Sequence, residues 1–175
     1  MLIFETNDGY KKIYIWKDII PFECTGYGIL NRHTKAGNMD WHIGTICMEA
    51  KLYPRHISNY AMICMKYTKN QNDATNIIIN FGNNKRFLKS HVLPFNKEVY
   101  VGLDKEFADA IDEFFEEYPV GNLPGGTIEI LGGAYDEVGS SNVSFKKVME
   151  LLIFVFVHID EMNNEELQSE LFKLI

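Results

Sequence analysis

The chain has 175 residues, of which 46% are apolar and 23% are charged, and its formal net charge is −7. This composition is typical of a globular protein with one buried core and argues against a largely disordered chain. The acidic balance argues against a general affinity for nucleic acid, because phosphate binding needs a positive surface.

The N-terminal sequence MLIFETNDGYKK lacks a basic start followed by a long apolar stretch, so it does not predict a signal peptide. The longest strongly apolar run, LLIFVFV at residues 151–157, is far shorter than the roughly 20 residues that span a bilayer. Cys24, Cys47 and Cys64 match no zinc or disulfide spacing, which favours buried reduced thiols. We therefore expect a cytoplasmic protein without membrane contact.

Residues 1–57 are rich in aromatic and β-branched residues and are punctuated by glycines, which predicts short strands and hairpins. The clearest strands are KKIYIW at 11–16 and WHIGTICMEAKLY at 41–53. GYGILNRHTKAG at 26–37 lacks a third glycine and a following helix, so it predicts a surface loop and not a phosphate site. We expect this region to be a β-rich extension packed on the same core as a second region, residues 58–175.

Two further strand-like runs, YAMICMKY at 60–67 and TNIIINF at 75–81, flank a polar, turn-forming stretch. This pattern predicts a β-hairpin. NFGNNKRF at 80–87 then predicts a turn, and VYVG at 99–102 a short strand.

The strongest helix prediction is DKEFADAIDEFFEEYP at 104–119. Its apolar residues form one stripe at helical spacing, Asp104 can cap the first turn, and Pro119 marks the end. Lys105 is the one cation among the acids of the opposite face, which are Glu106, Asp109, Asp112, Glu113, Glu116 and Glu117. Like charges at helical spacing repel. The purely structural interpretation of these acids is a solvated helix surface, and the functional interpretation is a binding surface for a basic partner.

GNLPGG predicts a loop, TIEIL a strand, and GGAYDEVGSS at 132–141 a turn that leads into a helix. Ser140 or Ser141 can cap that helix, which continues to residue 159 and is apolar nearly all round, so it should be buried. A strand over 151–159 is the alternative, because that stretch is β-branched and aromatic. The tail from residue 163 predicts a short amphipathic helix.

The order of these elements over residues 60–160 resembles domain four of elongation factor G. The helix start keeps Gly102, Lys105, Glu106 and Phe107 of that family's pattern. The later segment keeps seven positions in register: Gly133, Tyr135, Val138, Ser140, Ser141, Phe145 and Lys146. The resemblance implies an α+β fold, a two-layer α/β sandwich with a left-handed crossover.

Three departures separate the chain from that family. The family's tip histidine corresponds to Asp136 here, and its basic first tip loop is replaced by KNQNDAT at 69–75. The chain also has no G-x-x-x-x-G-K-[ST] motif and thus no GTPase domain. Tyr135 and Val138 are expected to pack, and Asp136 and Glu137 to remain at an exposed tip.

No residue set in the sequence predicts an enzyme. The five histidines show no metal-binding spacing, and GSSNVS is not a nucleophile elbow. The helix acids share one solvated face and do not flank a cleft as a glycosidase pair does. We therefore expect no metal, no cofactor and no catalytic residues.

The sequence thus favours a non-enzymatic acidic protein-binding module, most readily a small bacterial immunity or antitoxin-type protein. Such a protein neutralises a basic, toxin-like partner through electrostatic complementarity. The expected contacts are the six helix acids with Asp136 and Glu137. The alternative is a translation-associated factor that binds the ribosome through its domain-four-like fold. Direct DNA binding is not expected.

Overall fold

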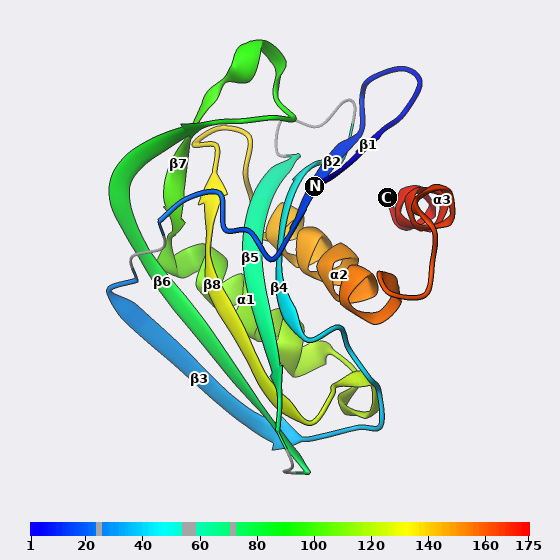
Figure 1. Ribbon diagram of the computed structural model, residues 1–175. Coiled ribbons are helices and arrows are strands. Elements are labelled where there is room, and N and C mark those ends of the chain that lie inside the picture. The colour runs from blue at the N-terminus through cyan, green and yellow to red at the C-terminus, as the bar shows by residue number, and fades with distance from the viewer. Residues whose placement is uncertain (24–25, 54–58, 71–72) are drawn as a thin grey trace.

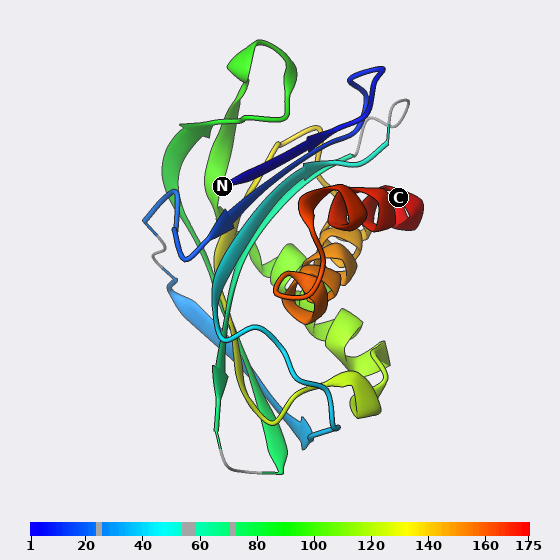
Figure 2. The same cartoon turned by 45° about the vertical axis from the view of Figure 1, so that its right-hand side comes forward.

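The computed structural model describes residues 1–23, 26–53, 59–70 and 73–175. Within these residues, eight strands form one mostly antiparallel sheet, and three α-helices cover one of its faces (Figures 1 and 2). The fold class is therefore α+β, as the sequence predicted. In the same residues, no helix combines the length and apolar composition that a membrane span requires.

The strands are β1 (Leu2–Glu5), β2 (Lys12–Lys17), β3 (Gly28–Lys35), β4 (Gly44–Lys51), β5 (Tyr60–Lys69), β6 (Ala74–Lys89), β7 (Glu98–Leu103) and β8 (Gly126–Tyr135). The helices are α1 (Lys105–Glu117), α2 (Asn142–His158) and α3 (Asn164–Leu174). Short 3-10 turns lie at Pro94–Asn96 (η1) and Val120–Asn122 (η2).

The N-terminal strands reach both edges of the sheet, whose order is β1-β2-β4-β5-β8-β7-β6-β3. β1 and β2 form one edge beside β4, whereas β3 pairs with the first half of β6 at the opposite edge (Figure 1). β3 lies in the segment predicted to be a surface loop. Its residues alternate between partial burial and exposure, as in a strand with one covered face. Leu30 packs against the main core, which is the apolar cluster between the sheet and the helices.

The predicted hairpin of residues 60–82 does not form, because β8 lies between β5 and β6. β8 pairs antiparallel with β5 and parallel with β6. The hydroxyl of Tyr67 donates to the carbonyl of Gly125 at 2.7 Å, and that of Thr75 donates to the carbonyl of Pro124 at 2.7 Å. These two hydrogen bonds fix the start of β8 between its neighbours.

β6 also continues through the segment predicted to be a turn. A β-bulge between Asn83 and Arg86 interrupts its register with β7, and the strand runs on to Lys89. A bulge bends and twists a strand without ending it. The second half of β6 therefore pairs with β7 in one long hairpin.

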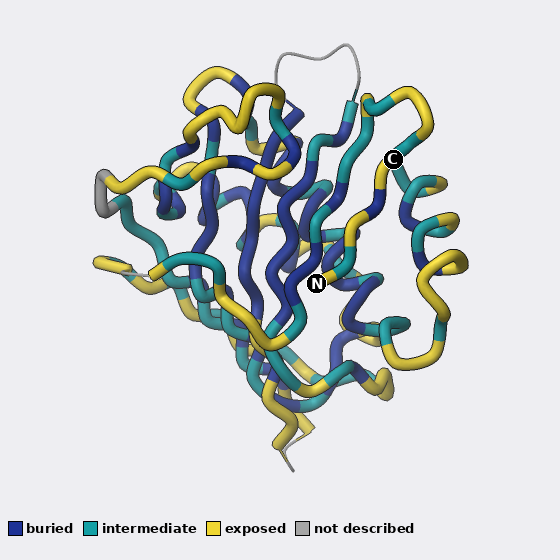
Figure 3. The backbone as a smooth tube through the Cα atoms, turned by 45° about the horizontal axis from the view of Figure 1, so that its top comes forward, coloured by how far each residue is buried: buried dark blue, intermediate teal, exposed yellow. Residues whose placement is uncertain are grey.

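The helices form much as their periodicity predicted. α1 buries one stripe that includes Phe107, Ile111 and Phe115. α2 is helical to His158, so the alternative strand does not occur, and its interior is buried against the sheet. Figure 3 shows the central strands buried along most of their length.

The helix starts differ from one another in how they are capped. Ser141 caps α2, since its side chain accepts from the backbone N–H of Ser144, as predicted for Ser140 or Ser141. Asp104 stands at the N-cap position of α1, but its carboxylate makes no capping hydrogen bond, contrary to expectation. Burial, and then a hydrogen bond to Asp104, raise the pKa of the Tyr135 phenol.

The sheet face opposite the helices has a smaller apolar core, which we call the outer cluster. Its buried members are Trp16, Cys47, Tyr60, Met62, Cys64, Val92, Val99 and Ala134. Leu88 of β6 and Leu93 of the β6–β7 connection pack against it. Near the β6–β7 connection, the sheet is thus covered on both faces.

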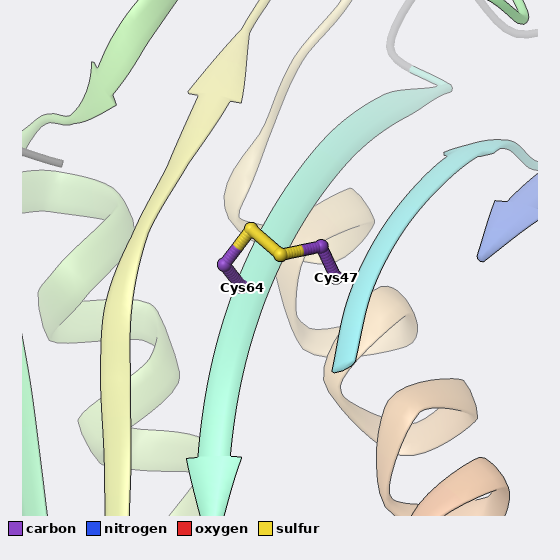
Figure 4. The surroundings of a disulfide bond; sticks show 2 residues. All are labelled: Cys47 and Cys64. Atoms are coloured by element: carbon purple, nitrogen blue, oxygen red, sulfur yellow. A yellow bond between two sulfur atoms is a disulfide. The ribbon is translucent and has the colours of Figure 1, made fainter. Parts of the chain in front are cut away.

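Cys47 and Cys64 form a disulfide inside the outer cluster (Figure 4). They are direct partners in the β4–β5 register, with Cα atoms 4.0 Å apart. This corrects the prediction of reduced thiols, because strand pairing brings together two cysteines whose spacing matches no known signature. Cys24 lies outside the described residues.

Candidate functional site

The six acids of α1 form an outward surface, which we call the acidic face: Glu106, Asp109, Asp112, Glu113, Glu116 and Glu117. These acids point outward because the apolar stripe on the other side of α1 is buried in the core. The sequence prediction held for the helix but was incomplete for the charges, since it counted Lys105 alone as a counter-charge.

Two cations from other elements reach the acidic face. Arg32 on β3 donates two hydrogen bonds to the Asp112 carboxylate, at 2.8 and 2.9 Å, and lies 3.4 Å from Glu116. Lys146 on α2 lies 2.9 Å from the Glu113 carboxylate. These contacts raise the pKa of both cations, for Arg32 chiefly through Asp112 and for Lys146 chiefly through Glu113. Both side chains therefore stay charged at neutral pH.

The acidic face keeps a negative excess after these contacts. Six carboxylates meet the three cations Lys105, Arg32 and Lys146, which leaves three excess negative charges. The side chains of Glu113 and Glu116 remain 61% and 66% exposed despite their ion pairs. Exposed ion pairs contribute little to stability. Their carboxylates can therefore exchange partners at small cost.

Asp136 lies in a different environment from the acidic face. It is 7% exposed, and its carboxylate lies 2.7 Å from the Nζ of Lys97, which follows η1. The expected exposed tip is therefore wrong for Asp136, because a cation on the β6–β7 connection covers it. Glu137 is exposed, as expected.

The loop that contains Asp136 has structural roles. The Ser140 hydroxyl accepts from the Asp136 N–H at 2.9 Å and donates to the Tyr60 carbonyl at 2.8 Å. Tyr135 stacks on Tyr100 with ring centroids 5.3 Å apart, as expected of a packed residue. Val138 was expected to pack as well, but it is 64% exposed.

Sequence reasoning missed a buried carboxylate on β4. Glu49 is fully buried and points to the outer-cluster face, where it accepts from the Tyr60 hydroxyl at 3.0 Å and the His91 N–H at 3.1 Å. The His91 Nδ1 lies 3.2 Å from the same carboxylate. The His91 ring also contacts Tyr14 and Trp16, with centroids 5.2 and 5.3 Å away.

This arrangement orients an imidazole that is 45% exposed over a fully buried carboxylate. Burial, and then the charge of Glu49, raise the pKa of Tyr60 well above its ordinary value, so the phenol remains a donor. The signal in the sequence was a lone acid inside the apolar strand ICMEA. A lone buried acid needs donors, and here the donors account for the residue without a substrate.

The described residues contain no group of three or more His, Cys, Asp or Glu side chains that could hold a metal ion. No protein-family model, no curated protein and no solved structure matches this chain.

Proposed function

We propose that this protein is a non-catalytic binding module whose acidic face engages a basic protein. The negative excess on the exposed side of α1 is the observation that carries the proposal. Complementary charge speeds association and excludes like-charged partners. An immunity or antitoxin-type protein, which covers a basic toxin, is the function that this surface fits best.

The proposed contact residues differ in how exposed they are. Glu106, Glu113, Glu116 and Glu117 are exposed and are the principal contacts. Asp109 and Asp112 are half-buried, with Asp112 held by Arg32, so they contribute mainly to the local field. Asp136 is covered by Lys97, which leaves Glu137 as the contact from its loop.

The test is capture of partners from an extract of the source cells by the tagged protein, at low and at high salt. The expected result is one basic protein, bound at low salt and released at high salt because screening weakens exposed charges. Its affinity is then measured with the purified partner by calorimetry.

The variant Glu106→Lys/Glu116→Lys should weaken that complex at least tenfold. Glu98→Lys/Glu161→Lys, which changes the net charge equally at exposed positions elsewhere, should leave it unchanged. Equal affinity of both double variants would contradict the proposal.

A translation-associated factor is the second candidate. It rests on the sequence resemblance of residues 60–160 to domain four of elongation factor G. Of the elements expected there, α1, β8 and α2 follow one another in that order, whereas the hairpin of residues 60–82 does not form. Co-sedimentation with purified ribosomal subunits tests it. Salt-sensitive co-sedimentation is expected for a ribosome-binding factor, and its absence at low salt eliminates this candidate.

A further inference from the structure

Two hollows lie next to each other on the helical side of the molecule. The first, of about 310 Å³, lies between Phe114 and Glu117 of α1 and Val143 and Lys146 of α2. The second, of about 290 Å³, is lined by α2, by the segment after α1 and by the end of α3, and includes Tyr118, Phe154, Val157 and Leu174. Glu150 lines both hollows. We call the two hollows together the α1–α2 groove, because both are lined by residues of α2.

The groove has an apolar floor that the fold leaves partly uncovered. Val143 is 68% exposed, and Phe114, Phe154 and Val157 are half-buried. Residues 143 and 157 are separated by about 21 Å of helix at 1.5 Å per residue. Both hollows are open to solvent. A small molecule would fill one of them and keep much of its own surface exposed, whereas bound small ligands usually bury most of theirs.

The charges along the groove are acidic on the α1 side. Glu117 lines the groove, and Glu113 and Glu116 of the acidic face lie on the same helix. On the α2 side, both lysines are already engaged. Lys146 lies 2.9 Å from Glu113, and Lys147 lies 2.7 Å from Glu150.

We propose that the α1–α2 groove binds a basic amphipathic α-helix of the partner protein. This inference rests on the proposed function and specifies the partner's structure. Helix-in-groove recognition uses apolar side chains at positions i, i+3 or i+4 and i+7 along one face. One such set of positions spans about 10 Å at 1.5 Å per residue, so a helix that repeats it over about 14 residues, or roughly 21 Å, can place side chains in both hollows. Its basic flank would then meet the acidic face.

The test uses a fluorescein-labelled peptide of about 18 residues, or roughly 27 Å of helix, with leucine on one face and lysine on the other. Binding is measured by fluorescence anisotropy. A peptide of the same composition with a scrambled order separates helix recognition from charge attraction. We expect the amphipathic peptide to bind at least tenfold more tightly than the scrambled one.

The groove is blocked by Val143→Trp, which places a large side chain at the edge of the first hollow on an exposed helical position. The matched control is Val138→Trp, because Val138 is 64% exposed, lies outside both hollows and carries the same side chain. We expect at least tenfold weaker peptide binding for Val143→Trp and less than a twofold change for the control.

The outcomes separate the groove from the acidic face. Unchanged peptide binding by Val143→Trp overturns the groove proposal, and so does failure of the wild-type protein to bind the peptide. If Glu106→Lys/Glu116→Lys still loses the natural partner in either case, the proposed function stands without the groove. Sedimentation of the wild-type protein as a dimer that Val143→Trp dissociates would assign the groove to a second copy and also overturn the proposal.

Discussion

Glu49 is a fully buried carboxylate that accepts a hydrogen bond from Tyr60 of the outer cluster. A fully buried carboxylate is tolerated because Tyr60 and the backbone and ring of His91 supply donors. Glu49→Ala would remove the acceptor of the buried Tyr60 hydroxyl and of the His91 backbone N–H. We expect the free energy of unfolding to fall by about 3 kcal/mol, measured by urea denaturation.

The variant Tyr60→Phe provides the comparison for Glu49. It removes one donor and keeps the shape of the ring, so a loss of about 1 kcal/mol is expected. In a double-mutant cycle, Glu49→Ala and Tyr60→Phe should be non-additive, because they share one hydrogen bond. Strict additivity would mean that this hydrogen bond does not stabilise the fold.

Asp160 makes a contribution to the free energy of unfolding that should depend on pH. A hydrogen bond from Lys17, and then one from His42, lower the pKa of this carboxyl below its ordinary value of 3.8. A carboxyl with a lowered folded-state pKa stabilises the fold above its unfolded pKa, and this contribution is lost as pH falls through the folded-state value. The Asp160 side chain is 55% exposed, which limits the contribution to about 0.5 kcal/mol.

We therefore expect Asp160→Asn to be less stable than the wild type by about 0.5 kcal/mol at pH 7. The difference should shrink below about pH 4 and vanish under strong acid. Thermal unfolding at a series of pH values measures it. A difference that stays constant with pH would show that the carboxylate charge is not its source.

At the level of elements, the disulfide links two adjacent central strands. Cys47 and Cys64 are 17 residues apart. Closing a loop of this size stabilises a fold by about 3 kcal/mol, largely through the unfolded chain. Reduction should lower the free energy of unfolding by about that amount, measured by urea denaturation with and without a phosphine reductant. In Cys47→Ala/Cys64→Ala, the reductant should have no effect.

Helices could be predicted from the sequence because their signals are local. The stripe containing Phe107, Ile111 and Phe115 repeats at 3.6-residue spacing, and the caps lie within a turn of the residues that they serve. Strand pairing is not local. Nothing in residues 60–82 shows that β8 enters between β5 and β6. The hydrogen bonds that fix β8 there are accepted by the carbonyls of Gly125 and Pro124, which lie 58 and 49 residues away in the chain from their donors.

The same limit explains what the sequence revealed of the candidate site. The acids of α1 could be found from helical spacing, since they belong to one element. Their counter-charges could not, because Arg32 and Lys146 arrive from β3 and α2. The prediction of an exposed tip was wrong at Asp136 for a similar reason, because Lys97 reaches this carboxylate from the β6–β7 connection.

At the scale of the whole molecule, the strands of residues 1–57 enter the sheet at two places, beside β5 and beside β6. β1 and β2 close one edge, β3 closes the other, and β4 lies between β2 and β5. β4 also supplies Ile46 and Met48 to the main core and Cys47 to the disulfide. Removing this segment would expose both the β5 edge and the β6 edge, and would uncover apolar side chains beneath α2.

We therefore expect residues 58–175, expressed alone, to lack a folded core. The measurement is a two-dimensional amide NMR spectrum, in which the full chain should show dispersed peaks and the fragment should not. Unpaired strand edges template intermolecular pairing, so the fragment should also aggregate as its concentration rises. Adding a separate chain of residues 1–57 should recover dispersed peaks if the strands act by completing the sheet. A dispersed spectrum from the fragment alone would show instead that the second region folds independently and that β1 to β4 are an accessory layer.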